Sequence, residues 1–189
     1  MMRKFLKNKK ALSSAVASLI LLVVSVLLAG VASNFALNVA GTRTQQENLF
    51  LSNVAVWYEN STASLGSLLV TNTGSTDIVL SKVTIKGQDC AWNATGSYVL
   101  FTKVEGALSA NLEYVNNFNQ TGSNTLNFDG TDYGFEVVGE NLILQSGWSM
   151  LFFIVNPGKL MVYDVGTPMR VTISTAQALY ATETIVKAV

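Results

Sequence analysis

The chain has 189 residues, and its 12 basic and 12 acidic side chains give a formal net charge of zero. It contains no histidine and one cysteine, 49% of its residues are hydrophobic, and only 13% are charged, against roughly 25% in typical soluble domains. This composition excludes histidine-dependent nucleophilic catalysis, histidine-ligated metals, an intramolecular disulfide and the basic footprint of a nucleic-acid-binding protein.

Charge is unevenly distributed near the N-terminus. Five basic residues lie within the first ten positions, and no charged residue occurs between Ala11 and Thr42. The centre of this stretch, Ala15–Ala29, is almost wholly apolar and lacks proline, so it predicts a helix. About 20 such residues cross the hydrocarbon core of a membrane, and the preceding positive charges favour a cytoplasmic N-terminus. We therefore expect the residues after the helix to lie outside the cell.

Three interpretations of this N-terminus compete. A secretory signal would be cleaved near the small residues Ala29–Ser33, but Leu12–Leu28 is long for the apolar part of such a signal. A lipoprotein signal is excluded, because Val31 stands where that signal needs a cysteine. A permanent membrane anchor fits the hydropathy without further assumption. The third interpretation is a short basic leader that is removed on the cytoplasmic side.

The third interpretation rests on the residues between the charges and the apolar run. They resemble the cleavage site of archaeal type IV pilin-like precursors, which carry class III signal peptides. The resemblance implies that a prepilin peptidase removes the leader, residues 1–11, and that the apolar helix stays in the mature protein. Val16 stands at the fifth mature position, where bacterial type IV pilins carry glutamate, so the resemblance is to archaeal members, most of all to crenarchaeal adhesion pilins. The residues of this leader cleavage site are Lys9, Lys10, Ala11 and Leu12.

We expect one hydrophobic helix over residues 12–57, with Gly41 as a weak point. In the precursor it would span the membrane, and the resemblance implies that it forms the filament core after assembly. Small residues let helix backbones approach closely, and a helix that is apolar all round is buried in lipid or in protein. The positions expected to pack against neighbouring copies are Ala15, Ser18, Leu19, Leu22, Ser25, Val26, Ala29, Gly30 and Ser33.

From Gly66 onward the pattern changes to short strands separated by turns. Apolar and polar residues alternate at 82–86 and at 169–174, which is typical of half-buried strands, whereas Met150–Val155 is apolar on both faces and predicts a central buried strand. Turn signals stand at Asn72–Gly74, at Asp129–Gly130 and at Asn156–Gly158. The predicted fold class is α+β: the long N-terminal helix, then an antiparallel β-sandwich (Ig-like) head over residues 58–189, with a barrel as the alternative.

Two segments of the head extend the resemblance. Leu69–Gly87 resembles the paired strands of archaeal pilin and archaellin head domains, and Val165–Ala176 resembles their C-terminal strand region. Together with the leader and the helix, these segments stand in the order that pilins have. Gln88–Gly147 is rich in asparagine and glycine and resembles no family.

Three Asn-x-Thr sequons make Asn60, Asn93 and Asn119 candidate N-glycosylation sites in an exported protein. Asn119 lies within the polar run Asn116–Thr125, which predicts an exposed loop. A sequon that carries a glycan must lie at the surface.

Side chains that could carry catalysis or bind metal are few. Acidic residues cluster at 129–140, but they show no spacing typical of calcium ligands, so we expect a solvated face rather than an acid–base pair. We expect Cys90 to be a buried apolar residue, and the three tryptophans to pack in the core or between the helix and the head rather than to stack on sugars. No cofactor, metal or catalytic residue is predicted. The residues considered are Asp129, Asp132, Glu136, Glu140, Cys90, Trp57, Trp92 and Trp148.

The sequence thus predicts a structural protein, the pilin subunit of an extracellular archaeal filament, and not an enzyme. Its expected partners are copies of itself in a helical homopolymer, a prepilin peptidase with the pilus assembly machinery and, for the precursor, the cytoplasmic membrane. No nucleic acid is expected. An adhesion pilus is favoured over an archaellin of the motility filament. The alternative from another class is a single-span anchored surface module, an adhesin or solute-binding domain, that does not polymerise.

Overall fold

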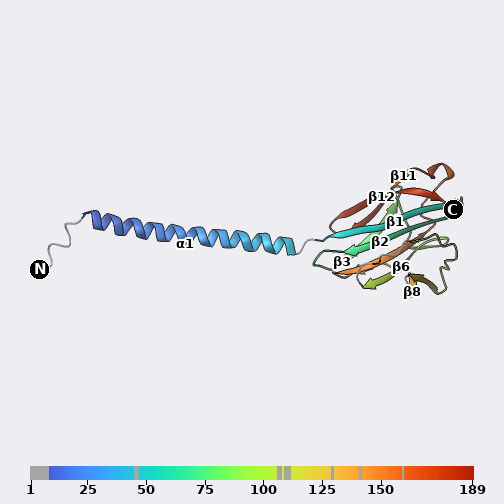
Figure 1. Cartoon of the computed structure of the whole chain (residues 1–189), viewed down its shortest axis with the longest axis horizontal. Coiled ribbons are helices and arrows are strands. Elements are labelled where there is room, and N and C mark those ends of the chain that lie inside the picture. The colour runs from blue at the N-terminus through green and yellow to red at the C-terminus, as the bar shows by residue number, and fades with distance from the viewer. Residues whose placement is uncertain are drawn as a thin grey trace. The chain divides into compact units, whose positions relative to one another are not determined.

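The computed structural model describes residues 9–44, 47–105, 108, 112–128, 130–140, 142–158 and 160–189. The chain divides into two compact units, Met1–Thr44 and Gln45–Val189. The first contains helix α1, Lys9–Thr44, and the second, called the head below, is built from strands (Figure 1). The predicted layout of an N-terminal apolar helix followed by a β-rich domain is confirmed.

Helix α1 ends earlier than the sequence predicted. It stops at Thr44, and the expected helical residues 49–57 belong instead to strand β1, Leu49–Asn60. Glycine and threonines near residues 41–44 weaken the helix, and the following Val, Trp and Tyr side chains favour a strand. In β1, the side chains of Val56 and Trp57 point to opposite faces of the sheet, and both are buried. Consecutive residues of this strand are therefore apolar, and the sequence shows neither the spacing of a helix nor the alternation of a half-buried strand.

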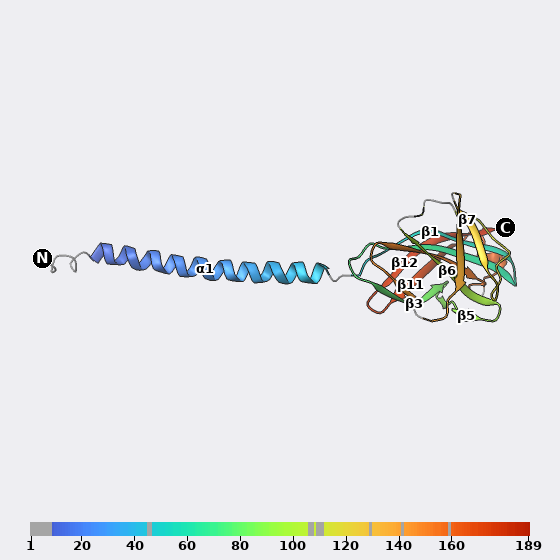
Figure 2. The same cartoon turned by 90° about the horizontal axis from the view of Figure 1, so that it is seen from below.

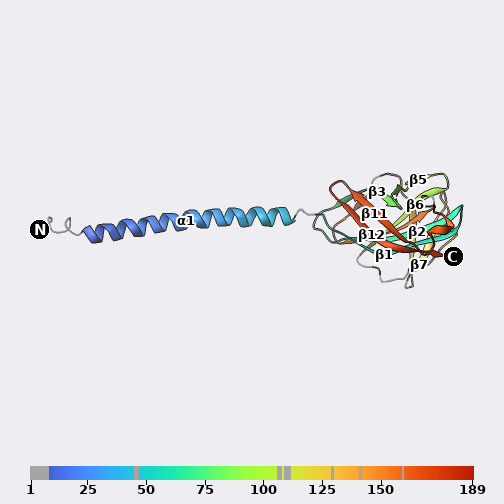
Figure 3. The ribbon, with the colours of Figure 1, turned by 90° about the horizontal axis from the view of Figure 1, so that it is seen from above.

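The described strands form one continuous path of pairing in the order β4-β3-β11-β12-β1-β2-β10-β6-β8-β7, with β5 on β6 and β9 on β3. Figures 2 and 3 show the head from two opposite sides. A short 3-10 helix, η2, spans Val162–Asp164. The strand bounds after β1 are β2 Ala63–Asn72, β3 Ile78–Ile85, β4 Gln88–Asp89, β5 Asn93–Ala94, β6 Ser97–Glu105, β7 Asn124–Phe128, β8 Thr131–Val137, β9 Leu142–Leu144, β10 Trp148–Val155, β11 Pro168–Thr175 and β12 Leu179–Ala188.

Two features of the pairing differ from the sequence-based expectation. First, the sheet is not wholly antiparallel, because β1 and β12 pair in parallel, with Val56 opposite Val186. Second, the segment predicted as paired strands, Leu69–Gly87, contains the end of β2 and all of β3, and these two strands do not pair with each other. β2 pairs with β1 and β10, whereas β3 pairs with β11 and β9. The turn at Asn72–Gly74 therefore connects two strands that have different pairing partners, and it does not close a β-hairpin.

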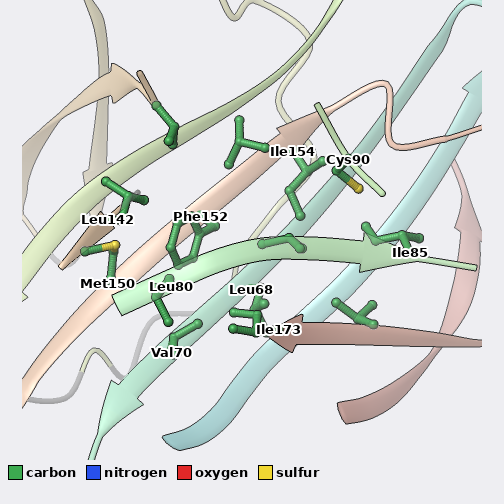
Figure 4. Packing of buried hydrophobic residues seen from close by; sticks show 14 of the residues in the cluster. Leu68, Val70, Leu80, Ile85, Cys90, Leu142, Met150, Phe152, Ile154 and Ile173 are labelled. Carbon is green, nitrogen blue, oxygen red and sulfur yellow. The ribbon is translucent and has the colours of Figure 1, made fainter. Parts of the chain in front are cut away.

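The main core joins strands that are distant in the pairing order. Leu68 and Phe152, from β2 and β10, belong to the same buried cluster as Leu80 and Ile173, from β3 and β11 (Figure 4). Met150–Ile154 is buried on both faces, which confirms the predicted central strand. Strands β3 and β11 therefore share one interior with β2 and β10, although three strands separate β3 from β2 in the pairing order.

A second core lies on the other face of β1, β2, β10 and β6. Its buried members include Leu100 and Phe153, and it is covered by side chains from residues 112–118 and from β7 and β8. Phe118 packs against Phe153, with ring centroids 5.0 Å apart, and against Phe135 at 6.4 Å. The segment that resembled no family is thus partly the cover of this second core.

Candidate functional site

The described part of α1 exposes an extended apolar surface. From Ser13 to Gly41 every side chain is exposed, and this stretch of 29 residues is long and apolar enough to cross a membrane. A membrane anchor, a pilin helix and a signal sequence near the N-terminus share this property. Leucine and valine side chains exposed to this degree require lipid or other protein around them.

The nine predicted packing positions lie on one side of α1. Because an α-helix has 3.6 residues per turn, these nine positions fall within an arc of about 140° around the helix axis. Leu19 and Leu22 are 66% and 64% exposed, and an added Cβ at Gly30 would meet no atom within 4 Å. Nothing in the described chain therefore covers this stripe.

Three polar side chains within the described part of α1 are bonded to the helix itself. Ser18 Oγ donates to the Ser14 carbonyl oxygen at 3.0 Å, and Ser25 Oγ donates to the Leu21 oxygen at 2.6 Å. Asn34 bonds in the same way to the Gly30 oxygen, at 3.1 Å. An unpaired polar group costs free energy in an apolar environment. Because these side chains are hydrogen-bonded within the helix, they can lie in lipid or against apolar protein.

The predicted leader cleavage site lies at the start of α1. Residues 1–8 of the leader lie outside the described residues, whereas the backbone of Lys9, Lys10, Ala11 and Leu12 is helical. The expected scissile bond, between Ala11 and Leu12, is therefore part of the first turn of the helix.

All three sequon asparagines are exposed, but their side-chain oxygens are bonded differently. Asn60 Oδ1 accepts hydrogen bonds from the backbone N–H and the hydroxyl of Thr62, at 2.9 and 2.8 Å. Asn119 Oδ1 accepts the same pair from Thr121, at 3.1 and 3.3 Å. Asn93 Oδ1 instead accepts from Gln120 Nε2 at 2.8 Å.

The three sequons lie at one end of the head. Antiparallel pairing places the β1–β2 turn, the end of β10 and the start of β6 side by side, with Val155 opposite both Leu65 and Tyr98. Asn156 connects the turns: its Oδ1 accepts from the backbone N–H of Ser64, and its Nδ2 donates to the carbonyl oxygen of Gly96. The sequence gives no hint of this grouping.

The described acidic residues near the β7–β8 hairpin lie at the surface. Asp132, Glu136 and Glu140 are exposed, Asp132 accepts a bond from Asn127 at 2.6 Å, and Asp129 lies outside the described residues. Within the described ranges, no three His, Cys, Asp or Glu side chains stand close enough to hold a metal ion.

Cys90 and the tryptophans lie in or against the cores, as predicted. Cys90 is 6% exposed, and burial raises the pKa of its thiol to about 12, so the thiol is protonated at neutral pH. Trp57 is buried in the second core, and Trp92 and Trp148 pack against the main core.

An ion pair between Lys86 and Asp164 was not predicted from the sequence. Lys86 Nζ lies 2.8 and 2.7 Å from the two carboxylate oxygens of Asp164, and the backbone N–H of Met161 donates to Oδ2. Burial alone would raise the pKa of this carboxyl, but the bonds from Lys86 and Met161 outweigh burial and lower the pKa. The pair attaches the η2 loop to the β3–β4 turn.

A cavity of about 170 Å³ lies beside the Asn60 turn and is lined by Glu59, Tyr114 and Asn156, among others. The Tyr114 hydroxyl donates to Glu59 Oε2 at 2.6 Å. Burial and the neighbouring Glu59 raise the pKa of Tyr114 to about 12, so the phenol stays protonated. This bond fastens the cover of the second core to β1.

Comparisons with known proteins do not assign the chain to a family. No family model and no curated protein matches it. A solved structure of Spo0M, the sporulation control protein of Bacillus subtilis, aligns with 76% of this chain and 49% of its own length, at 9% identity and a TM-score of 0.28. The chain thus spans about half of that protein, and a likeness at this level carries no argument about fold or function.

Proposed function

We propose that the protein is the pilin-like subunit of an extracellular filament of the archaeal type IV pilus kind. The observation that carries the proposal is the exposed apolar surface of α1, which follows a basic segment that resembles a leader cleavage site. In this proposal the surface faces lipid in the precursor and neighbouring copies of the chain in the filament.

The leader, residues 1–11, keeps the N-terminus in the cytoplasm and is removed by a prepilin peptidase. The helix from Leu12 then leaves the bilayer and packs in a helical core. Acyl chains are as apolar as leucine, so this transfer gains little hydrophobic free energy and depends on close packing of backbones. The small residues at Ala15, Ala29 and Gly30 would allow that approach. Contacts between unlike surfaces that do not close on themselves give an open helical polymer.

The head would form the surface of the filament and serve adhesion. We propose an Ig-like β-sandwich, which is supported by the main core because it joins side chains of β3 and β11 with side chains of β2 and β10, which are not neighbours in the strand order. The sequons place candidate glycans on this outer surface, and no catalytic role is proposed.

The N-terminus of the protein recovered from cells tests the proposal. We expect a mature chain that begins at Leu12. Replacing Lys10 with Glu and Ala11 with Phe should abolish this cleavage and the filaments, because the peptidase needs a basic residue and then a small one before the cut. The matched control is Lys4→Glu, which alters charge in the leader but not at the cleavage site. An intact Met1 or a start near Ser33 contradicts the proposal.

Electron microscopy of sheared cell-surface material separates the pilin from an anchored binding module. We expect filaments that contain this chain as the main protein by mass spectrometry. A chain that stays in the membrane fraction and occurs in no filament indicates the single-span surface module instead.

A further inference from the structure

The end of the head that carries the sequons lies away from the first residue of β1. Residue 49 begins β1 and Asn60 ends it, so the sequon end is reached only after the whole length of this strand. Gln120, the middle residue of the third sequon, donates through Nε2 both to Asn93 Oδ1 and to the carbonyl oxygen of Ala94, at 2.8 and 3.1 Å. Two of the sequons are therefore in direct contact.

The side-chain amide of Asn119 lies against Gly122, and the position of this amide requires that residue 122 has no side chain. A Cβ added at Gly122 would lie 2.7 Å from Asn119 Nδ2, a distance that forces a displacement, although Gly122 itself has no left-handed φ. The oxygen of the same amide is held by Thr121. The Asn119 side chain is thus held through its oxygen. Its nitrogen is the atom that would carry a sugar, and residue 122 has no side chain that would cover it.

Asn93 is held in another way. It lies in β5, where it pairs with Tyr98 of β6, and its side-chain oxygen bonds to Gln120 rather than to the hydroxyl of Thr95. Asn60 lies where β1 ends and turns into β2, and its oxygen already accepts the bond from the Thr62 hydroxyl. The Thr hydroxyl is the group that defines a sequon. In Asn60 and Asn119 the side-chain amide is already bonded to this hydroxyl before any modification, whereas in Asn93 it is not.

We infer that Asn60 and Asn119 are the N-glycan acceptors of this chain and that Gln120 withholds Asn93 from modification. The inference rests on the export to the cell exterior that the proposed function includes. In the reaction, the amide nitrogen forms a bond to the anomeric carbon of a lipid-linked oligosaccharide phosphate. The bond from that carbon to the phosphate oxygen breaks, the lipid phosphate leaves, and the amide loses one proton to a base. Gly122 and Gln120 act as positioning residues.

Glycopeptide mass spectrometry on the full chain purified from its own cells tests the inference. We expect glycans at Asn60 and Asn119 and little at Asn93. Gln120→Ala preserves the third sequon and should raise the occupancy of Asn93 about fivefold, the factor that one net hydrogen bond corresponds to. Gln177→Ala, at an exposed position in the β11–β12 turn, is the matched control and should leave all three occupancies unchanged.

Gly122→Ala should lower the occupancy of Asn119 and leave that of Asn60 unchanged. Gly139→Ala is its control, because a Cβ there would meet no atom within 4 Å. Equal occupancy of Asn93 and Asn60 in the unaltered chain, no glycan at Asn60 and Asn119, or no response to Gln120→Ala and Gly122→Ala overturns the inference. The same digest reports the mature N-terminus: a start at Leu12 without glycans refutes only the inference, whereas glycans on a chain with intact Met1 refute only the pilin.

Discussion

Single side chains fix the η2 loop to the rest of the head. Asp164 is 7% exposed, and its carboxylate is surrounded by Lys86 Nζ and the backbone N–H of Met161. The Thr167 hydroxyl donates to the backbone oxygen of the same aspartate at 2.6 Å. Lys86 also lies over the ring of Tyr163, 5.6 Å from its centroid. These contacts hold an exposed apolar loop in one conformation.

Asp164→Asn should lower the free energy of unfolding at neutral pH by about 1–2 kcal/mol, less than for a fully buried pair because Lys86 is partly exposed. The folded-state pKa of Asp164 lies below the ordinary value of 3.8, so its contribution is present above that pH and disappears as pH falls through the lowered pKa. Urea unfolding of the detergent-solubilised chain, followed by tryptophan fluorescence, measures both effects. A deficit that persists undiminished at pH 2 contradicts the assignment.

The control for this prediction is Lys82→Met. Lys82 and Asp89 form an ion pair at 3.3 Å in which both side chains are about half exposed or more. Such pairs contribute little, so the change should alter the free energy of unfolding by less than about 0.5 kcal/mol.

Exposure of the sequons and burial of Cys90 followed from residue type alone, whereas the Lys86–Asp164 pair did not. Its partners stand 78 positions apart, and nothing in the sequence near either residue specifies the other. Gln120 presents the same difficulty, since its contact with Asn93 depends on how two distant turns meet. The exposure or burial of single residues could be predicted from residue type. Contacts between residues that are distant in sequence could not, because they depend on the topology of the fold.

At the scale of elements, α1 is the part that the sequence predicts best, because its apolar run is long and uncharged. Its C-terminal boundary was wrong because the centre of β1, Ala55–Trp57, is buried on both faces and so lacks the alternation that marks a half-buried strand. The cover of the second core was missed for a related reason. Its aromatic residues, such as Tyr114 and Phe118, are spaced irregularly along a segment without a strand.

Gly30→Leu should leave leader cleavage and membrane insertion intact but reduce the number of filaments at least about tenfold. The chain itself has space for the larger side chain, so only packing between copies would suffer. Val31→Leu, at a position 69% exposed, is the control and should assemble normally. Filament counts by electron microscopy, with the mature N-terminus read in parallel, measure the result. Normal filament numbers with Gly30→Leu contradict a close helix contact at this position.

Phe118→Ala should destabilise the head by about 2 kcal/mol, because the side chain is half-buried between two other aromatic rings. Hydrogen exchange should increase in residues 112–123 and not in β3 or β11. Phe50→Ala is the matched control: its ring is 60% exposed, and its loss should cost less than about 0.5 kcal/mol. Equal effects of the two changes would show that Phe118 does not anchor the cover.

At the scale of the whole molecule, the sequence predicted a helix followed by a β-rich domain but not the order of the strands. The alternation at 82–86 and the apolar run at 150–155 located strands correctly. Which strands pair is decided by contacts between distant residues, so neither the separation of β2 from β3 nor the parallel pair of β1 and β12 had a local signal.

The pairing of β1 with β12 has a consequence for the timing of folding. Thr184 Oγ1 bonds to the Val54 carbonyl oxygen across 130 positions of sequence, and the parallel register follows at Val56 and Val186. The first strand of the head therefore acquires its second neighbour only when the last strand has been synthesised. In the membrane-bound precursor that we propose, the head would complete its fold only after its C-terminus has been translocated. Contacts this distant in sequence form slowly. Until then, the unpaired edge of β1 is open to pairing with other chains, and such pairing leads to aggregation.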